Sequence, residues 1–476
     1  MKLGRFKFIF AFIIFTLIFN ENKAQLILME DIGDITYMTM KTGVGFYYDE
    51  DLQNKIEEIG DNIEMNLDTD EEIKFNVLDM QELSAFATFG GYVYISRGLL
   101  SILDTEDELA GVIAHELVHV NDRHATQKLY RRILPEILKV PGNLLKKANL
   151  EFAGKLLNVP IELTLGSINA VFDRWQEYQA DRRGAELAHK AGYNPLGLEA
   201  ALRKVANYQR ITAGHEDKFE FLGEHPTTVK RTRKIKGIAK RFKNRTYETG
   251  VLYGLLDSLI IGQNPEKGVR LPDNTFAHPI LKAQIKFPKS WYIQPAKEAL
   301  SASNKSGKVG LIAGLGYFST DMHVLANRYI NDHENDKKTT MINDTINING
   351  YDARQVTLTR KKLFRKQFTQ TTWIYLPNKD LVLVLTGVAN KEVDFDTIQQ
   401  IKSTFQPLDS LHASQVVTRY LHVDTSNYET VGDFIFRKDG QDNIFWIEGL
   451  NYKQLGDTLN NEIVKWVSSE PYKYEK

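Results

Sequence analysis

In the first half of the chain, the hydrophobic positions repeat mainly with a helical period. Apolar residues between positions 52 and 63 recur at three- and four-residue steps, which predicts a helix over residues 49–64. Thr105 and Glu108 form a capping box ahead of an apolar run, so a second helix is expected from residue 105 to the mid 120s. A third helix is predicted over residues 169–190, closed by Gly192 and Pro195.

Strands are expected at fewer places in this half and at many places after it. Alternation predicts strands around residues 75–78 and 92–96. Beyond about residue 276 the pattern is rich in strands, with Asn349-Gly350 typical of a hairpin turn and helices expected over residues 321–331 and 395–405. We therefore predict an α+β chain with three parts. A mostly helical domain covers residues 25–250, an antiparallel α+β domain covers 276–408, and a small module covers 415–468.

The N-terminal residues have the features of an export signal. Lys2, Arg5 and Lys7 precede an apolar run over residues 8–19, and a small residue, Ala24, follows at a suitable distance. The alternative is a membrane anchor, but twelve apolar residues are fewer than the roughly 20 that span a bilayer. We predict a signal peptide over residues 1–24 and an exported protein.

The composition of the chain limits which partners it can bind and which residues can hold a metal ion. The 476 residues include 60 Lys and Arg against 61 Asp and Glu, so the net charge of -1 gives no overall attraction for nucleic acid, and no nucleic-acid partner is expected. The basic run over residues 231–245 is interpreted as a solvated helix face. The chain has no cysteine, which excludes disulfides, thiolate ligands and a cysteine nucleophile. Any metal ligands must be histidines and carboxylates.

The sequence His115-Glu116-Leu117-Val118-His119 lies inside the predicted second helix. Residues four apart share a helical face, so both imidazoles can bind one metal ion, while Glu116 stands near its open side. A catalytic zinc needs a third protein ligand and leaves one position to water. Glu177 and Asp181 stand four apart on the predicted third helix, where Glu177 can bind zinc and Asp181 can orient a ligating histidine.

With these motifs the sequence resembles the zinc metallopeptidases of family M48, which include CAAX prenyl endopeptidases, HtpX-type membrane proteases and BepA-type periplasmic proteases. His115 to His119 match the first family motif, and Glu177 with Asp181 match its Glu-x-x-x-Asp. Residues 85–94 resemble the stretch that leads into the active-site edge strand, and His225 with Arg231 match a late histidine and arginine pair. The resemblance covers about residues 50–240.

The resemblance implies a gluzincin-like protease domain that binds one Zn²⁺ per chain through His115, His119 and Glu177, with Glu116 as the base. His225 and Arg231 are then expected to stabilise the oxyanion, although His225 has an alternative role as a latch on the metal. An extended, unfolded polypeptide is expected to add as a strand along Gly90, Gly91, Tyr92, Val93 and Tyr94.

These features favour a zinc endopeptidase in the periplasm or cell envelope of a Gram-negative-type bacterium, with an association with the envelope or outer membrane. One alternative is an envelope binding or chaperone protein with a vestigial protease domain. Another is a cell-wall peptide amidase, which rests on a faint LysM-like similarity of residues 415–468. Residues 129–170 are expected to form either packed helices or a lid. The oligomeric state is not predicted.

Overall fold

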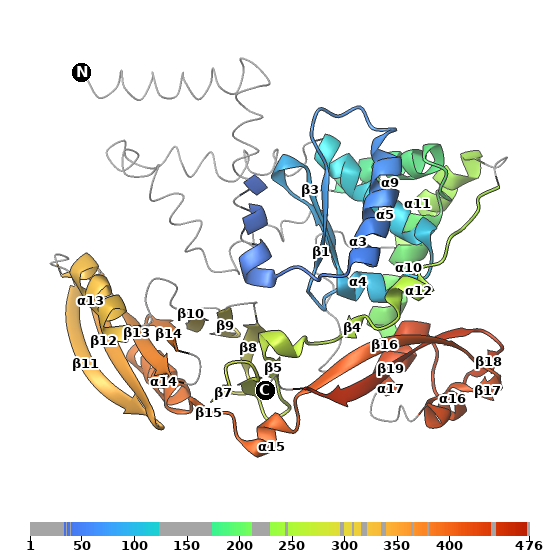
Figure 1. The fold of residues 1–476 in the computed structure, drawn as a ribbon. Helices are drawn as coiled ribbons and strands as arrows, with labels where there is room; N and C mark the ends of the chain where they lie inside the picture. The colour runs from blue at the N-terminus through green and yellow to red at the C-terminus, as the bar shows by residue number, and fades with distance from the viewer. Residues whose placement is uncertain are drawn as a thin grey trace, which may run out of the picture. The chain divides into compact units, whose positions relative to one another are not determined.

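The computed structural model describes residues 33–122, 174–211 and 229–473, with short gaps inside the first and third ranges. The chain forms two compact units (Figure 1). The first unit contains residues 45–262 and 419–468, and the second contains residues 263–418 together with the C-terminal residues. The predicted signal peptide and residues 129–170, which are expected to form packed helices or a lid, lie outside the described residues. None of the described helices is long and apolar enough to cross a membrane.

Helices make up most of the first unit. Asp49 caps α3 (Glu50–Glu64), as the apolar spacing predicts, and four isoleucine and leucine side chains of this helix are buried. The predicted capping box is also present, with Thr105 and Glu108 bonded to each other's backbone N–H groups at the start of α5 (Glu106–Asn121). Around them pack α9 (Arg174–Lys190), α10 (Gly197–Ile211) and α11 (Val229–Ala239).

A small sheet lies beside these helices (Figure 1) and corrects one prediction. Its strand order is β1 (Lys74–Leu78), β3 (Tyr92–Ser96), β2 (Ala85–Ala87). β3 pairs in parallel with β1 and antiparallel with β2. It is therefore the central strand, and the predicted edge strand that includes Tyr92, Val93 and Tyr94 has no free edge for a substrate to join. Among the described residues, the edge on the side of α5 is β2.

The segment after residue 418 returns to the first unit. β16 (Val417–Thr425) pairs with β4 (Ile260–Ile261) and with β19 (Ile463–Pro471). The side chains of Leu421, Trp446, Leu450 and Val467 belong to the same hydrophobic core as α3 and α5. Residues 419–468 are thus part of the first unit, and the prediction of a separate module over residues 415–468 is wrong.

This segment also has a local core of its own. β17 (Tyr428–Thr430), α16 (Val431–Arg437), α17 (Ile444–Asn451) and β18 (Thr458–Asn460) follow in this order, and the two strands pair antiparallel. A second small cluster centred on Phe434 fills the space between these elements. The LysM-like similarity stays a prediction, because the order of elements alone does not identify a glycan-binding module.

The second unit is built on an antiparallel sheet of seven strands. The order is β11 (Thr339–Ile348), β12 (Tyr351–Lys362), β13 (Arg365–Leu376), β14 (Leu381–Ala389), β10 (Gly310–Leu315), β9 (Ala299–Asn304), β8 (Trp291–Pro295). Asn349 and Gly350 connect β11 to β12 with φ of 49° and 95°, as the predicted type I′ turn requires.

Two helices cover opposite faces of this sheet. α13 (Met322–His333) packs over Val356 and Trp373, while α14 (Glu392–Ser403) packs over the core that contains Leu385 and Ile374. A smaller sheet of β5 (Val269–Arg270), β6 (Thr275–His278), β7 (Ala283–Lys286) and β15 (Gln406–Pro407) completes the unit. The antiparallel α+β architecture that the sequence predicts is present, with bounds of 263–418 in place of 276–408.

Candidate metal centre

α5 and α9 bring together three potential metal ligands. His115 and His119 stand one turn apart on α5, and their Nε2 atoms lie 3.2 Å from each other. Glu177 on α9 has one carboxylate oxygen 3.6 Å from Nε2 of His115 and the other 3.6 Å from Nε2 of His119. All three side chains are buried. Their ligand atoms lie within 4.8 Å of one another.

These distances fit a zinc ion. Ligand bonds of about 2.0–2.1 Å hold two nitrogen ligands of a tetrahedral ion about 3.3 Å apart, close to the separations of 3.2 and 3.6 Å. Two imidazole nitrogens and one carboxylate oxygen are also the donor set of known catalytic zinc sites. The three residues predicted as ligands are therefore the three that the structure brings together.

α5 and α9 pack closely together, which brings Glu177 within reach of the two histidines. A Cβ atom built on Gly184 of α9 would lie 3.1 Å from backbone atoms of His115, tighter than most real Cβ contacts. Any side chain at residue 184 would press against α5, on which both histidines lie. In the sequence, the only sign of this close approach is Gly184 itself, a glycine inside a predicted helix and seven residues after Glu177.

Behind the ligands lies a chain of charged contacts. Oδ1 of Asp181 lies 3.3 Å from Nδ1 of His115, the ring nitrogen on the other side from the ligand atom, as predicted for an orienting carboxylate. Arg231 on α11 binds both Asp181 and Glu177, with Nη1 2.9 Å from Oε2 of Glu177. Although burial raises it, the contacts with His115 and Arg231 lower the pKa of Asp181 to about 2.

This position differs from the role predicted for Arg231. Three nitrogens of its guanidinium are engaged with carboxylates, and the side chain is buried behind the third ligand. Arg231 therefore positions Glu177 and Asp181 and is not aimed at an oxyanion. His225, predicted as its partner, lies outside the described residues.

Glu116 is buried beside the ligands, where a base is expected. Burial, together with the nearby Glu177 carboxylate, raises the pKa of Glu116 to about 8, although the charges of His115 and Arg231 lower it. The backbone N–H of Ala87 in β2 donates a hydrogen bond to the Glu116 carboxylate and also lowers the pKa. A divalent cation beside this carboxylate would lower the pKa towards the range of a general base that works near neutral pH.

The sequence motifs do not predict the contact between Glu116 and Ala87. It places the edge strand β2 next to the base, whereas the predicted substrate residues Gly90 to Tyr94 lie in the turn before β3 and in β3 itself. In the sequence, only the apolar triplet of residues 85–87, within the stretch 85–94 that resembles family M48, indicates this strand.

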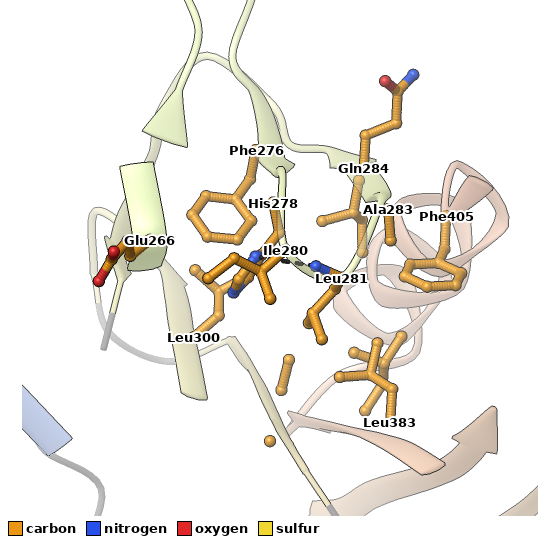
Figure 2. Close-up of a pocket in the computed structure, with 14 residues that line it drawn as sticks. Glu266, Phe276, His278, Ile280, Leu281, Ala283, Gln284, Leu300, Leu383 and Phe405 are labelled. Carbon is orange, nitrogen blue, oxygen red and sulfur yellow. Dashed lines mark hydrogen bonds between the residues drawn. The ribbon is translucent and has the colours of Figure 1, made fainter. Parts of the chain in front are cut away.

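An apolar cavity of about 140 Å³ lies in the second unit (Figure 2). Leu300, Leu383 and Phe405 line it together with small residues of β7 and β10. His278 is its one imidazole, and burial lowers the pKa of His278 to about 4. The Leu281 N–H donates to Nδ1 of this ring over 3.4 Å. The residues that line this cavity include no group that could hold a metal ion. Among the described residues, the candidate metal site is the one between α5 and α9.

Comparison with known proteins finds proteases among the relatives of this chain. The chain is 28% identical over 218 residues to a beta-barrel assembly-enhancing protease of Yersinia pestis, covering 44% of each protein. It is 29% identical over 198 residues to a protease HtpX homolog of Salinibacter ruber, covering 35% of this chain and 68% of the relative. A putative beta-barrel assembly-enhancing protease of Vibrio cholerae is 32% identical over 144 residues, or 29% of each protein.

The similarity is thus concentrated in one part of the chain. The aligned parts span less than half the length of the two beta-barrel assembly-enhancing proteases. The family model for peptidase family M48 matches residues 48–239, the range that contains His115, His119, Glu177 and Arg231. Residues 48–239 of this chain are therefore similar to peptidase family M48.

Proposed function

We propose that this protein is a zinc-dependent endopeptidase that cleaves unfolded or misassembled polypeptides in the bacterial cell envelope. The observation that carries the proposal is the convergence of His115, His119 and Glu177 beside a buried Glu116. A vestigial domain in a binding or chaperone protein has no need to retain a base at this position, which disfavours that alternative.

Each side chain has a distinct task in this proposal. His115, His119 and Glu177 would hold one zinc ion, which when bound lowers the pKa of water and polarises a carbonyl group. Glu116 accepts the proton of the attacking water and passes it to the leaving amine. Asp181 fixes the ring of His115 through Nδ1, and Arg231 fixes the carboxylates of Glu177 and Asp181.

The edge strand β2 is the favoured place for the substrate backbone. It ends at Ala87, whose N–H reaches Glu116, so a chain paired with β2 would pass close to the base. Backbone pairing binds an extended segment with little regard to its side chains. This supports selection of unfolded segments over one particular residue type.

The envelope location rests on two supports outside the active site. The N-terminal residues have the pattern of an export signal. Two of the relatives are named for enhancing the assembly of beta-barrel proteins. Misassembled envelope proteins expose extended segments of the kind that an edge strand binds.

The test is a measurement of zinc content and cleavage on the same samples. The protein as purified is expected to contain one zinc ion per chain and to cleave casein. Glu116→Gln should keep the zinc and lose cleavage by a factor of at least about 10², the scale of a missing general base. Glu186→Gln, a change of the same kind on the outer side of α9, is the control and should keep both. Loss of zinc in Glu116→Gln, or full activity, would refute the assignment.

A further inference from the structure

The outer side of α11 and of the short helix η3 (Lys240–Phe242) is strongly basic. Residues 229–242 contain no acidic residue. Six of their lysine and arginine side chains are exposed: Lys230, Arg233, Lys234, Lys236, Lys240 and Arg241. We call these six residues the basic face.

The basic face points away from the metal centre. Residues three, four and seven apart lie on one side of a helix. Arg231, Ile235 and Ile238 form the buried side, with Arg231 reaching Glu177. Gly237 lies among the exposed residues, and a Cβ atom built there would meet nothing within 4 Å. The outer side of the helix is therefore open as well as charged.

Little of this charge is neutralised within the part of the chain that the structure describes. Lys236 lies 3.2 Å from Glu199, and Lys234 lies over the ring of Tyr178 at 3.9 Å from its centre. The whole chain carries a net charge of only -1. The positive field is therefore a local property of this surface, and its complement is an anionic surface.

An exposed aromatic side chain, Trp175, lies on α9, the helix that Lys234 of the basic face contacts. Trp175 on α9 is 65% exposed and stands three residues before Tyr178, so the two rings share a side of α9. Lys234 joins this side to α11 through its contact with Tyr178. An exposed indole beside several lysines is typical of helices that lie on membrane surfaces, because the ring is stable at the level of the headgroups.

We propose that the basic face and Trp175 dock this protein onto an anionic phospholipid surface. The lysine and arginine side chains would contact the headgroup phosphates, and the indole would enter the interface. Phospholipid is favoured over an acidic polypeptide or RNA because the charges lie along the convex outer side of a helix and Lys234 contacts the helix that carries an exposed indole. Arg231 lies on the same helix, so docking through α11 would keep the metal centre close to the lipid surface.

The first test is sedimentation of the full chain with vesicles of two compositions. Binding is expected to vesicles of phosphatidylcholine and phosphatidylglycerol mixed two to one, and not to phosphatidylcholine alone. Added salt should weaken it strongly, since the attraction is screened. Binding of equal strength to both kinds of vesicle would overturn the proposal. So would binding to RNA or polyglutamate without binding to vesicles.

Charge removal locates the surface. The triple change Lys230→Gln, Arg233→Gln, Lys240→Gln should lower vesicle binding about 100-fold, from about fivefold for each charge near an anionic surface. The control removes three exposed charges from the second unit, with Lys289→Gln, Lys305→Gln, Lys391→Gln, and should stay within about threefold of the original protein. An equal loss in both triples would show non-specific attraction and overturn the proposal.

The indole is tested by its fluorescence. Lipids brominated near the headgroup should quench part of the tryptophan emission, and Trp175→Phe should remove that part. Unchanged quenching in Trp175→Phe would exclude Trp175 from the surface. This inference goes beyond the proposed peptidase function and does not rest on it. Glu116→Gln should bind vesicles like the original protein, so failure of either idea can be told from failure of the other.

Discussion

Arg231 grips Asp181 at two points, with Nε 3.0 Å from Oδ2 and Nη2 2.6 Å from Oδ1. A planar guanidinium matches a carboxylate in this way, and a lysine ammonium cannot. Asp181 in turn lies against His115, so the orientation of this proposed metal ligand depends on a residue of another helix. The geometry of the candidate metal centre therefore depends on how α11 packs on α9.

Arg231→Lys should weaken zinc binding by about 10-fold, and Arg231→Ala by up to about 100-fold, the range seen when partners of metal ligands are removed. The reason is that lysine keeps the positive charge but cannot form the bidentate contact with Asp181. Competition against a zinc chelator measures the affinity. Arg233→Lys, on the exposed side of the same helix, is the control and should bind zinc normally. Unaltered affinity in Arg231→Ala would show that Asp181 and Glu177 hold their positions without it.

Lys465→Met should destabilise the first unit by about 3 kcal/mol, the scale of breaking a buried charged contact. Nζ of Lys465 is buried and donates to the carbonyls of Ser101 and Leu103, and it lies 2.8 Å from Asp104. Urea unfolding measures the free energy. Lys473→Met removes a lysine that is 90% exposed and should change stability by less than about 0.5 kcal/mol. Equal stability of the two variants would contradict the prediction.

The second unit should become more stable as the pH rises from about 7 to about 10. Burial lowers the pKa of Lys402 to about 7, whereas an unfolded lysine titrates near 10.4. In this window the unfolded chain binds the extra proton, so the free energy of unfolding rises by up to about 1.4 kcal/mol per pH unit. Below pH 7 lysine is charged in both states and the gain is absent.

Lys402→Met should remove this slope, because Nζ no longer titrates next to Gln370 and Thr372. Urea unfolding at several pH values gives the slope for each variant. Lys289→Met, an exposed lysine of the same unit, should leave it as it is. A slope that persists in Lys402→Met would assign the pH dependence to other groups.

His225 has two predicted roles with opposite consequences. If it rests on the metal as a latch, His225→Ala should raise cleavage of a short unstructured peptide, because the open ligand position is freed. If it donates to the oxyanion, the same change should lower cleavage by about 10² to 10³-fold. We expect the latch in the resting protein. An unchanged rate would remove His225 from the site.

Local signals account for the parts of the structure that were predicted well. The capping box, the two histidines one turn apart and the Asn349-Gly350 turn each act within a few residues, so the chain itself reveals them. The place of β3 between β1 and β2 depends on pairing with a strand almost twenty residues earlier, which alternation alone does not specify.

The contacts of Lys465 could not be predicted for the same reason. Its partners, Ser101 and Leu103, lie more than 300 residues away in the sequence. The role of Arg231 shows a different limit. The sequence motif predicts that Arg231 lies near the metal ligands. The direction in which its guanidinium points depends on the packing between α9 and α11, which the motif does not describe.

The return of residues 419–468 to the first unit makes that unit discontinuous, with the second unit inserted between its two parts. During synthesis, residues 45–262 emerge long before Leu421 and Val467, which complete their core. The ribosome must therefore produce residues 263–418 of the second unit before the fold of the first unit can close. A chain interrupted within residues 263–418 would carry all three proposed metal ligands but not the finished core, so the proposed peptidase activity would appear only in chains synthesised beyond Val467.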